Sequence, residues 1–282
     1  MVMNDICYHH EKLNIDNSLF PIIDCSYVMI MDRSRYELDV RKQLKKYPLS
    51  KKIILQWNKG FKNCQKKLFD QVSVADLADS FKLVLHNALI NDYNHILILE
   101  EDFIIDERIE NIKYREEITD FLVDEEPNIL LLGSILWNTG EKKGNFIRVK
   151  WKTGTHAIIL NKKTIKYLHD LMENNENLID IDNITNQYVY KKYSYKIPLI
   201  MQVWNDSDNK KNWGKGVVKN ENIRQLNNTM YSSFLEYFGF TQENTIKKAF
   251  HNHYEIHFNT FYKLLAIILN IISTILGKNE KN

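Results

Sequence analysis

Cysteine is scarce in this chain, with 3 residues among 282. The spacing of Cys7, Cys25 and Cys64 matches no zinc-binding pattern, and three cysteines are a poor basis for a disulfide framework. Their scarcity favours a reducing compartment. The first residues, MVMNDICYHHEK, also lack the apolar stretch of a signal peptide. We therefore expect a cytoplasmic protein.

A strong excess of charge is also absent. The formal net charge is +2, and the basic pairs are scattered along the chain. Nucleic-acid binders usually concentrate basic residues on one face, so we expect no nucleic-acid partner. Hydrophobic residues make up 44% and charged residues 26%, which is typical of a globular protein with a packed core.

The most apolar stretch, residues 261–276, is short for a membrane-spanning helix. Its 16 residues compare with the ~18 that such a helix needs. Lys263, Asn270 and Thr274 fall on one helical stripe, so the pattern is amphipathic. Packing of this segment as a core or docked helix is our first interpretation. Peripheral membrane contact, and hence a membrane-associated protein, is the alternative.

Short apolar runs typical of buried strands alternate with segments of helical periodicity as far as about residue 205. The predicted strands cover residues 25–31, 52–57, 95–99, 128–133, 146–151, 156–160 and 196–203. The predicted helices cover residues 35–46, 73–91, 114–123, 162–172 and 182–190, with a capping box at Ser73 and Asp76 and an N-cap at Asn161. The alternation predicts an α/β fold with an open, mixed, mostly parallel sheet, helices on both faces and a C-terminal helical segment. We expect an N-terminal extension (1–24), a main domain (25–222) and a C-terminal helical region (223–282).

The predicted strand His95–Leu99 runs directly into three acidic residues, Glu100, Glu101 and Asp102. Ligands of open α/β sheets bind beyond the carboxyl ends of the strands. If strand geometry continues, the side chains of Glu100 and Asp102 point to the same side. Two such carboxylates suit Mn²⁺ or Mg²⁺, which can bridge a diphosphate and neutralise its charge when it leaves. A solvated acidic turn is the plain alternative. A nucleotide-hydrolase strand is disfavoured, because the chain has no G-x-x-x-x-G-K-[ST] loop.

The residues around this motif resemble glycosyltransferase family 25. Ile96–Phe103, ILILEEDF, resembles the family's "hhhLEDD" signature. Further similar segments follow in the family's order: Tyr27–Ser34 (YVMIMDRS), Asn128–Gly133 (NILLLG), Gly154–Ile159 (GTHAII), Asp180–Asp182 (DID), Gln202 and Ser207-Asp208. The resemblance covers roughly residues 25–210 and extends to glycosyltransferases of large DNA viruses. The chain has Asp79-Ser80, Glu37 and Glu101 where the family usually has Ser-His, Arg and Asp.

The resemblance implies a GT-A (Rossmann-like) fold and a metal-dependent glycosyltransferase. The reaction expected from it transfers a hexose, galactose or glucose, from a UDP-sugar with inversion. The acceptor stays open among a glycan, a lipid-linked saccharide and a hydroxylated protein side chain. The alternative from another class is a non-catalytic GT-A-like protein that binds a glycan or a partner.

Three groups of residues are candidates for the site. Asp102 and Glu100 are the expected ligands of Mn²⁺ or Mg²⁺, and Asp208 is a third candidate that is otherwise a loop acid. The candidates for nucleotide-sugar contacts are Arg33, Arg35, Glu101, His156, Gln202 and Ser207. A solvated helix start is the alternative for the two arginines, and a structural role is the alternative for the histidine. Asp182 and Asp180 are candidates for the general base, although Asp182 suits the N-cap of its helix equally well.

Overall fold

The computed structural model describes residues 5–203, 221–237, 239–240 and 245–259. Its strands are β1 (Tyr8–Asn14), β2 (Cys25–Met31), β3 (Lys52–Asn58), β4 (His95–Glu100), β5 (Phe103–Ile105), β6 (Ile129–Leu131), β7 (Ile135–Lys143), β8 (Phe146–Thr153), β9 (Ala157–Asn161), β10 (Lys192–Tyr195) and β11 (Ile200–Gln202). Its helices are α1 (Glu37–Lys46), α2 (Ser73–Ile90), α3 (Ile112–Asp124), α4 (Lys162–Asn174), α5 (Ile181–Tyr188), α6 (Glu221–Tyr237) and α7 (Ile246–Phe258), with the short 3-10 helices η1 (Asp5–Cys7) and η2 (Glu107–Glu110).

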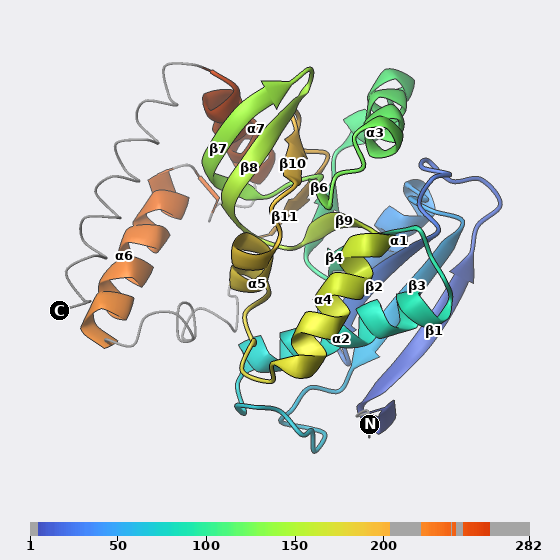
Figure 1. Ribbon diagram of the computed structural model, residues 1–282, viewed down its shortest axis with the longest axis vertical. Helices are drawn as coiled ribbons and strands as arrows, with labels where there is room; N and C mark the ends of the chain where they lie inside the picture. Colours follow the sequence, from blue (N-terminus) through green and yellow to red (C-terminus); the bar gives the residue numbers. More distant parts are fainter. Residues whose placement is uncertain (1–4, 204–220, 238, 241–244, 260–282) are drawn as a thin grey trace.

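Nine strands form one mixed sheet in the order β1-β3-β2-β4-β9-β6-β10-β8-β7 (Figure 1). Parallel pairing joins β3 to β2, β2 to β4 and β10 to β6. The other neighbours are antiparallel, including β4 and β9, where Leu99 lies opposite Ala157. Because β9 runs against β4, the residues that precede β9 lie beside the acidic end of β4. The α/β fold with a mixed sheet is thus confirmed, and this reversal positions the candidate site.

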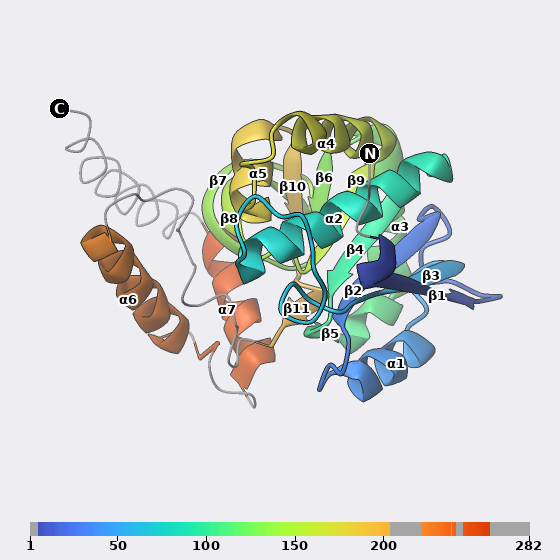
Figure 2. The same ribbon diagram turned by 90° about the horizontal axis from the view of Figure 1, so that it is seen from below.

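The sheet buries an apolar layer on each of its faces. Ile96 and Ile98 of β4 pack in one layer with residues of α2, α4, α5 and α7. Leu97 and Leu99 pack in the other layer with residues of α1 and α3. Figure 2 shows α2 and α4 on one side of the β2, β3 and β4 strands and α1 on the other. Burial on both faces explains why β4 is a continuous apolar run rather than an alternating one.

The helices α6 and α7 pack against β7, at the end of the sheet. The ring centroid of Phe234 on α6 lies 4.6 Å from that of Trp137 on β7. On α7, His253 Nε2 accepts a hydrogen bond from the Leu136 backbone N–H at 2.9 Å. No helix of the described ranges is long and apolar enough to cross a membrane. The apolar segment 261–276 lies outside the described residues, so its packing or membrane contact stays a prediction.

Several strands were not expected from the sequence. β1 lies within the expected N-terminal extension, yet it pairs along its whole length with β3. Its sequence, YHHEKLN, is polar because most of the strand is exposed at the edge of the sheet. β5, β7 and β10 were also not predicted, and the strand expected at 196–203 is reduced to β11, which pairs with β5 in a separate small sheet.

The two predicted helix starts have different outcomes. Asn161 caps α4 as predicted, because its Oδ1 accepts from the Thr164 backbone N–H at 2.8 Å. The capping box at Ser73 is wrong. Val72 occupies the N-cap position of α2 without a side-chain bond, and Asp76 turns to a buried lysine instead.

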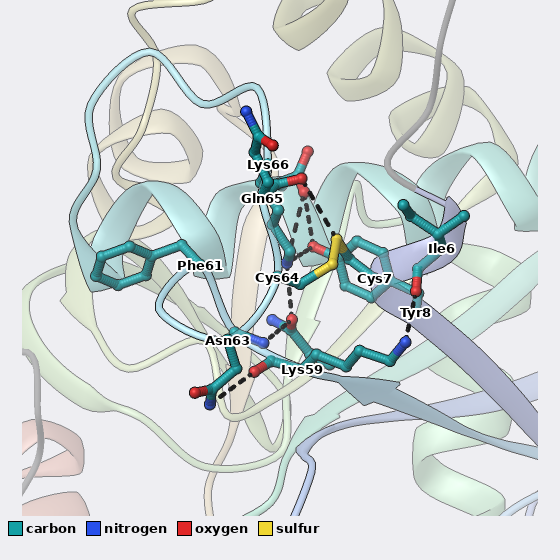
Figure 3. Close-up of a disulfide and its surroundings, with 12 residues drawn as sticks. Ile6, Cys7, Tyr8, Lys59, Phe61, Asn63, Cys64, Gln65 and Lys66 are labelled. Atoms are coloured by element: carbon teal, nitrogen blue, oxygen red, sulfur yellow. Dashed lines mark hydrogen bonds and ion pairs between the residues drawn. A yellow bond between two sulfur atoms is a disulfide. The ribbon is translucent and has the colours of Figure 1, made fainter.

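A disulfide joins Cys7 to Cys64, 57 residues apart in the sequence (Figure 3). Cys25 is a buried free thiol. The pairing of β1 with β3 explains this bridge. It places Cys7 beside Lys59, whose backbone N–H donates to the Cys7 carbonyl at 3.1 Å, and Cys64 follows in the next turn of the chain. The cysteine argument for a reducing compartment therefore no longer holds, because disulfides are typical of oxidising ones.

The loop that carries the disulfide also carries a buried ion-pair cluster. The fully buried Nζ of Lys66 donates to Tyr8 Oη at 2.6 Å, to Asn58 Oδ1 at 2.7 Å and to Asp76 Oδ1 at 2.5 Å. Tyr8 Oη in turn donates to Asp79 Oδ2 at 2.7 Å. The cluster ties the edge strand β1, the end of β3 and the first turns of α2 to one another.

Candidate functional site

The carboxylates of Glu100 and Asp102 are held by residues from two other segments. Glu100 Oε1 accepts a hydrogen bond from Thr155 Oγ1 at 3.0 Å, just before β9. Both carboxylate oxygens of Asp102 accept from Gln202 Nε2 on β11, at 3.2 and 3.0 Å. The backbone carbonyl of Asp102 also accepts from the Val203 N–H at 2.9 Å. The site is thus assembled from the end of β4, the start of β9 and the end of β11.

The pKa values of Glu100 and Asp102 are both raised above their ordinary range. For Glu100 the loss of hydration is the largest cause, and repulsion from Asp102 and Asp182 adds to it. For Asp102 the loss of hydration also dominates, while the bonds from Gln202 and the charge of Arg35 act in the opposite direction. Both side chains keep part of their surface open to solvent. The pair therefore carries negative charge at a cost that a bound cation would relieve.

Asp182, on the first turn of α5, is held by β8 and by the turn that follows β8. Its Oδ1 accepts from Lys152 Nζ at 2.7 Å, and its Oδ2 accepts from the Gly154 backbone N–H at 3.0 Å. Asp180 is the N-cap of α5, since its Oδ1 accepts from the Asn183 backbone N–H at 3.1 Å. The capping role considered for Asp182 therefore belongs to Asp180, while the charge of Asp182 contributes to the raised pKa of Glu100.

His156 is completely buried. Burial is the main cause that lowers the pKa of His156 to about 3, and the charge of Lys152 lowers it further. The ring lies against Gln202 and the Ile200 carbonyl, but neither ring nitrogen makes a well-formed hydrogen bond within the described residues. Gly154, at a φ of 88°, leaves room for the ring, because a Cβ there would lie 2.8 Å from His156 Nδ1. His156 is thus a neutral, buried residue whose ring lies against Gln202.

The two arginines and Glu101 lie at the same sheet edge. Arg35 is exposed, donates to Tyr36 Oη at 2.8 Å, and is close enough for its charge to lower the pKa of Asp102. Arg33 is exposed at a φ of 63°. Glu101 Oε2 accepts from the last backbone N–H of β2 at 2.8 Å, so this carboxylate faces β2. The charges of both Glu101 and Arg35 act on Asp102, Glu101 raising its pKa and Arg35 lowering it.

Lys152 and Thr155 are residues of the site that the sequence analysis did not single out. Lys152 is buried on β8, only two residues after the exposed Lys150. Register shifts between β7 and β8 break the usual alternation there, so no pattern indicated this burial. Ser207 and Asp208 lie outside the described residues, and their roles stay predictions.

Glu100 and Asp102 offer carboxylate oxygens, the kind of ligand that a hard divalent cation takes. Among the residues that the structure describes, no three His, Cys, Asp or Glu side chains are arranged to hold a metal ion. Glu100 and Asp102 supply two carboxylates whose pKa values are raised mainly by burial. Mg²⁺ is commonly bound by one or two carboxylates, with water and substrate phosphates completing its shell.

Comparison with known proteins gives only distant likenesses. No family model and no curated protein sequence matches the chain. The protein A197 from STIV has a TM-score of 0.40 and 13% identity, over 62% of this chain and 83% of that one. A glycosyltransferase involved in the glycosylation of the major capsid of PBCV-1 has a TM-score of 0.39 and 10% identity, over 67% of this chain and 98% of that one. A mannose-1-phosphate geranyltransferase from Thermus thermophilus has a TM-score of 0.35 and 11% identity, over 60% and 73%.

Likenesses this distant identify neither a family nor a reaction. Membership of glycosyltransferase family 25 therefore stays a prediction that rests on the residues of the chain.

Proposed function

We propose that this protein is a metal-dependent glycosyltransferase of the GT-A type that transfers a hexose from a UDP-sugar. The observation that carries the proposal is the pair of half-buried carboxylates, Glu100 and Asp102, at the end of an inner strand. This is the edge where α/β sheets bind their ligands. The resemblance to family 25 favours galactose or glucose as the sugar. The acceptor is a glycan, a lipid-linked saccharide or a hydroxylated protein side chain.

In this proposal Glu100 and Asp102 hold Mn²⁺ or Mg²⁺, with Asp208 as the third protein ligand. The ion supplies positive charge to the donor diphosphate and to the departing UDP. Thr155 and Gln202 orient the two carboxylates through the hydrogen bonds described above. The side chains proposed to contact the nucleotide sugar directly are Arg33, Arg35, Glu101 and Ser207. Gln202 and His156 are proposed to support the donor site from the protein side, through the bonds of Gln202 to Asp102.

Transfer with inversion requires a base that accepts the proton of the acceptor hydroxyl. Asp182 is the proposed base, because its carboxylate is partly exposed and close enough to Glu100 to raise the pKa of that residue. Asp180 is the weaker candidate, since its carboxylate already caps α5. Asp180→Asn keeps a capping side chain and should preserve activity, whereas Asp182→Asn should lower it by on the order of 10²-fold or more.

The release of UDP from UDP-galactose and from UDP-glucose tests the proposed reaction. We expect release that depends on Mn²⁺ or Mg²⁺, stops on chelation, and falls by on the order of 10²-fold in kcat/KM in Asp102→Asn. Glu107→Gln is the matched control, since Glu107 is an exposed acid on the nearby η2. Equal rates in wild type and Asp102→Asn would defeat the metal assignment. Binding of a UDP-sugar with no turnover would instead indicate a non-catalytic GT-A-like protein.

A further inference from the structure

Lys152 is a buried cation next to the proposed base. Its side chain has no solvent exposure, and its Nζ donates to Asp182 Oδ1 at 2.7 Å. Its backbone is fixed as well, because the Lys152 N–H donates to Asn186 Oδ1 at 3.1 Å and Asn186 Nδ2 donates to the Lys152 carbonyl at 2.7 Å. Asn186 and Asp182 lie on the same helix, α5. The two contacts therefore hold β8 and α5 in one arrangement around the carboxylate.

The two members of this ion pair differ in their access to solvent. The ammonium group of Lys152 is enclosed, whereas the side chain of Asp182 is 30% exposed. Both Asp182 oxygens are oriented, one by Lys152 and the other by the Gly154 N–H at 3.0 Å. A substrate at the sheet edge can therefore meet Asp182 and cannot meet Lys152. The contact through which Lys152 can act on the reaction is therefore the one with Asp182, while its charge also acts from a distance on Glu100.

A second buried lysine shows that burial alone does not explain this arrangement. Lys192 is also buried, but its Nζ donates to the backbone carbonyls of Thr185, Asn186 and Val189, at 3.1, 3.2 and 2.5 Å. Those three carbonyls belong to the last turn of α5 and to its C-cap residue, Val189, where a cation is favourable. Lys192 thus stabilises a helix end, whereas Lys152 reaches towards a partly exposed carboxylate at the candidate site.

We propose that Lys152 is a positioning residue of the transfer reaction, which orients the Asp182 carboxylate and balances its charge without touching substrate. This inference rests on the proposed function. Truncation of Lys152 should affect donor binding only weakly, because Lys152 bonds to Asp182 and its charge is a small contribution to the pKa of Glu100. It should slow the step in which Asp182 accepts a proton, because proton transfer depends on the placement of the base.

Steady-state release of UDP with Mn²⁺ present, and with water as the acceptor, tests this inference without knowledge of the natural acceptor. The donor is whichever of UDP-galactose and UDP-glucose the wild type uses. We expect Lys152→Met to lower kcat by on the order of 10²-fold with a donor KM within about threefold of wild type. Lys150→Met is the matched control, an exposed lysine two residues away on β8, and should leave kcat and KM unchanged. Lys152→Arg should recover part of kcat, because a guanidinium also pairs with a carboxylate.

A double variant keeps the inference testable if Lys152→Met does not fold. Lys152→Met combined with Asp182→Asn removes both charges of the pair and avoids a partly buried carboxylate without its cation. If Lys152 acts only through Asp182, the double variant has the same kcat as Asp182→Asn alone.

Two kinetic results would overturn the inference and leave the proposed function standing. One is equal kinetics in Lys152→Met and Lys150→Met, and the other is a double variant much slower than Asp182→Asn. A wild type that releases no UDP would overturn the proposed function and the inference with it.

Discussion

Loss of the Cys7–Cys64 disulfide should lower the free energy of unfolding by up to about 4 kcal/mol. The bridge joins residues 57 positions apart. For a closed segment of that length, the chain-entropy relation gives about 14 cal/mol/K of entropy removed from the unfolded chain, or about 4 kcal/mol at 25 °C. The folded loop keeps its other anchors, because the buried Lys66 still bonds to Asn58 and Asp76. Reduction should therefore destabilise the protein mainly through its unfolded state.

Urea unfolding with and without a thiol reductant measures this difference. The Cys7→Ser/Cys64→Ser variant should unfold at the same urea concentration as the reduced wild type and should not respond to reductant. Thiol titration in denaturant is the control. It should find one reactive thiol, that of Cys25, before reduction and all three cysteines afterwards. Three thiols before reduction, or a midpoint that reductant does not move, would refute the reasoning.

Two further predictions follow from the site. The metal-free protein should lose stability as pH rises above about 4.5, because Glu100 and Asp102, with pKa values raised in the folded state, give up their protons later there than in the unfolded chain. The stability that these two groups contribute is fully present below their pKa values in the unfolded chain, and it is lost as pH rises through their higher pKa values in the folded protein. The urea concentration at the midpoint of unfolding should therefore fall from about pH 4 to pH 8, and Glu100→Gln should flatten this pH profile. An unchanged pH profile in that variant would contradict the assignment. Gly154→Ala should cost about 1–3 kcal/mol, since its Cβ would meet His156 Nδ1 at 2.8 Å. Gly144→Ala, also at positive φ but with nothing within 4 Å, measures the backbone strain alone, and equal thermal shifts in both would argue against the clash.

The inner strands of the sheet could be predicted from the sequence, because a strand that is buried on both faces is a continuous apolar run. The runs that became β2, β3 and β4 are short, apolar and followed by polar turns, and their bounds were predicted to within a residue. The edge strands left no such signal. β1 is polar because most of its side chains are exposed, and β7 ends in charged residues beyond the packed part of the sheet. The disulfide was missed for the same reason, since it depends on the pairing of β1 with β3.

The candidate site was accessible only in part. The acids at the end of β4 were identified because nothing but a ligand site or a solvated turn explains three carboxylates after a buried strand. Lys152 was missed, because its burial depends on the irregular pairing of β7 with β8 rather than on a repeating pattern. The role of Thr155 likewise depends on the direction of β9, which a sequence pattern does not show. The sequence spacing did not decide which of Asp180 and Asp182 caps the helix and which is the candidate base. The hydrogen bonds show that Asp180 caps α5 and that Asp182 pairs with Lys152.

The reversal of chain direction between β4 and β9 decides which residues can act together. In a parallel arrangement the residues before β9 would enter the sheet at the edge opposite the acids, and Thr155 would lie a full strand length from Glu100. The antiparallel pairing instead brings the 152–156 segment to the acidic end of β4, where Thr155 bonds to Glu100 and Gly154 bonds to Asp182. The same pairing sends His156 into the core, where it has no solvent exposure. This short segment therefore contributes the Lys152 ammonium group, the Gly154 N–H and the Thr155 hydroxyl to the candidate site, and it contributes the His156 ring to the core. Within the GTHAII motif it is thus Thr155, rather than His156, that bonds to the acidic end of β4.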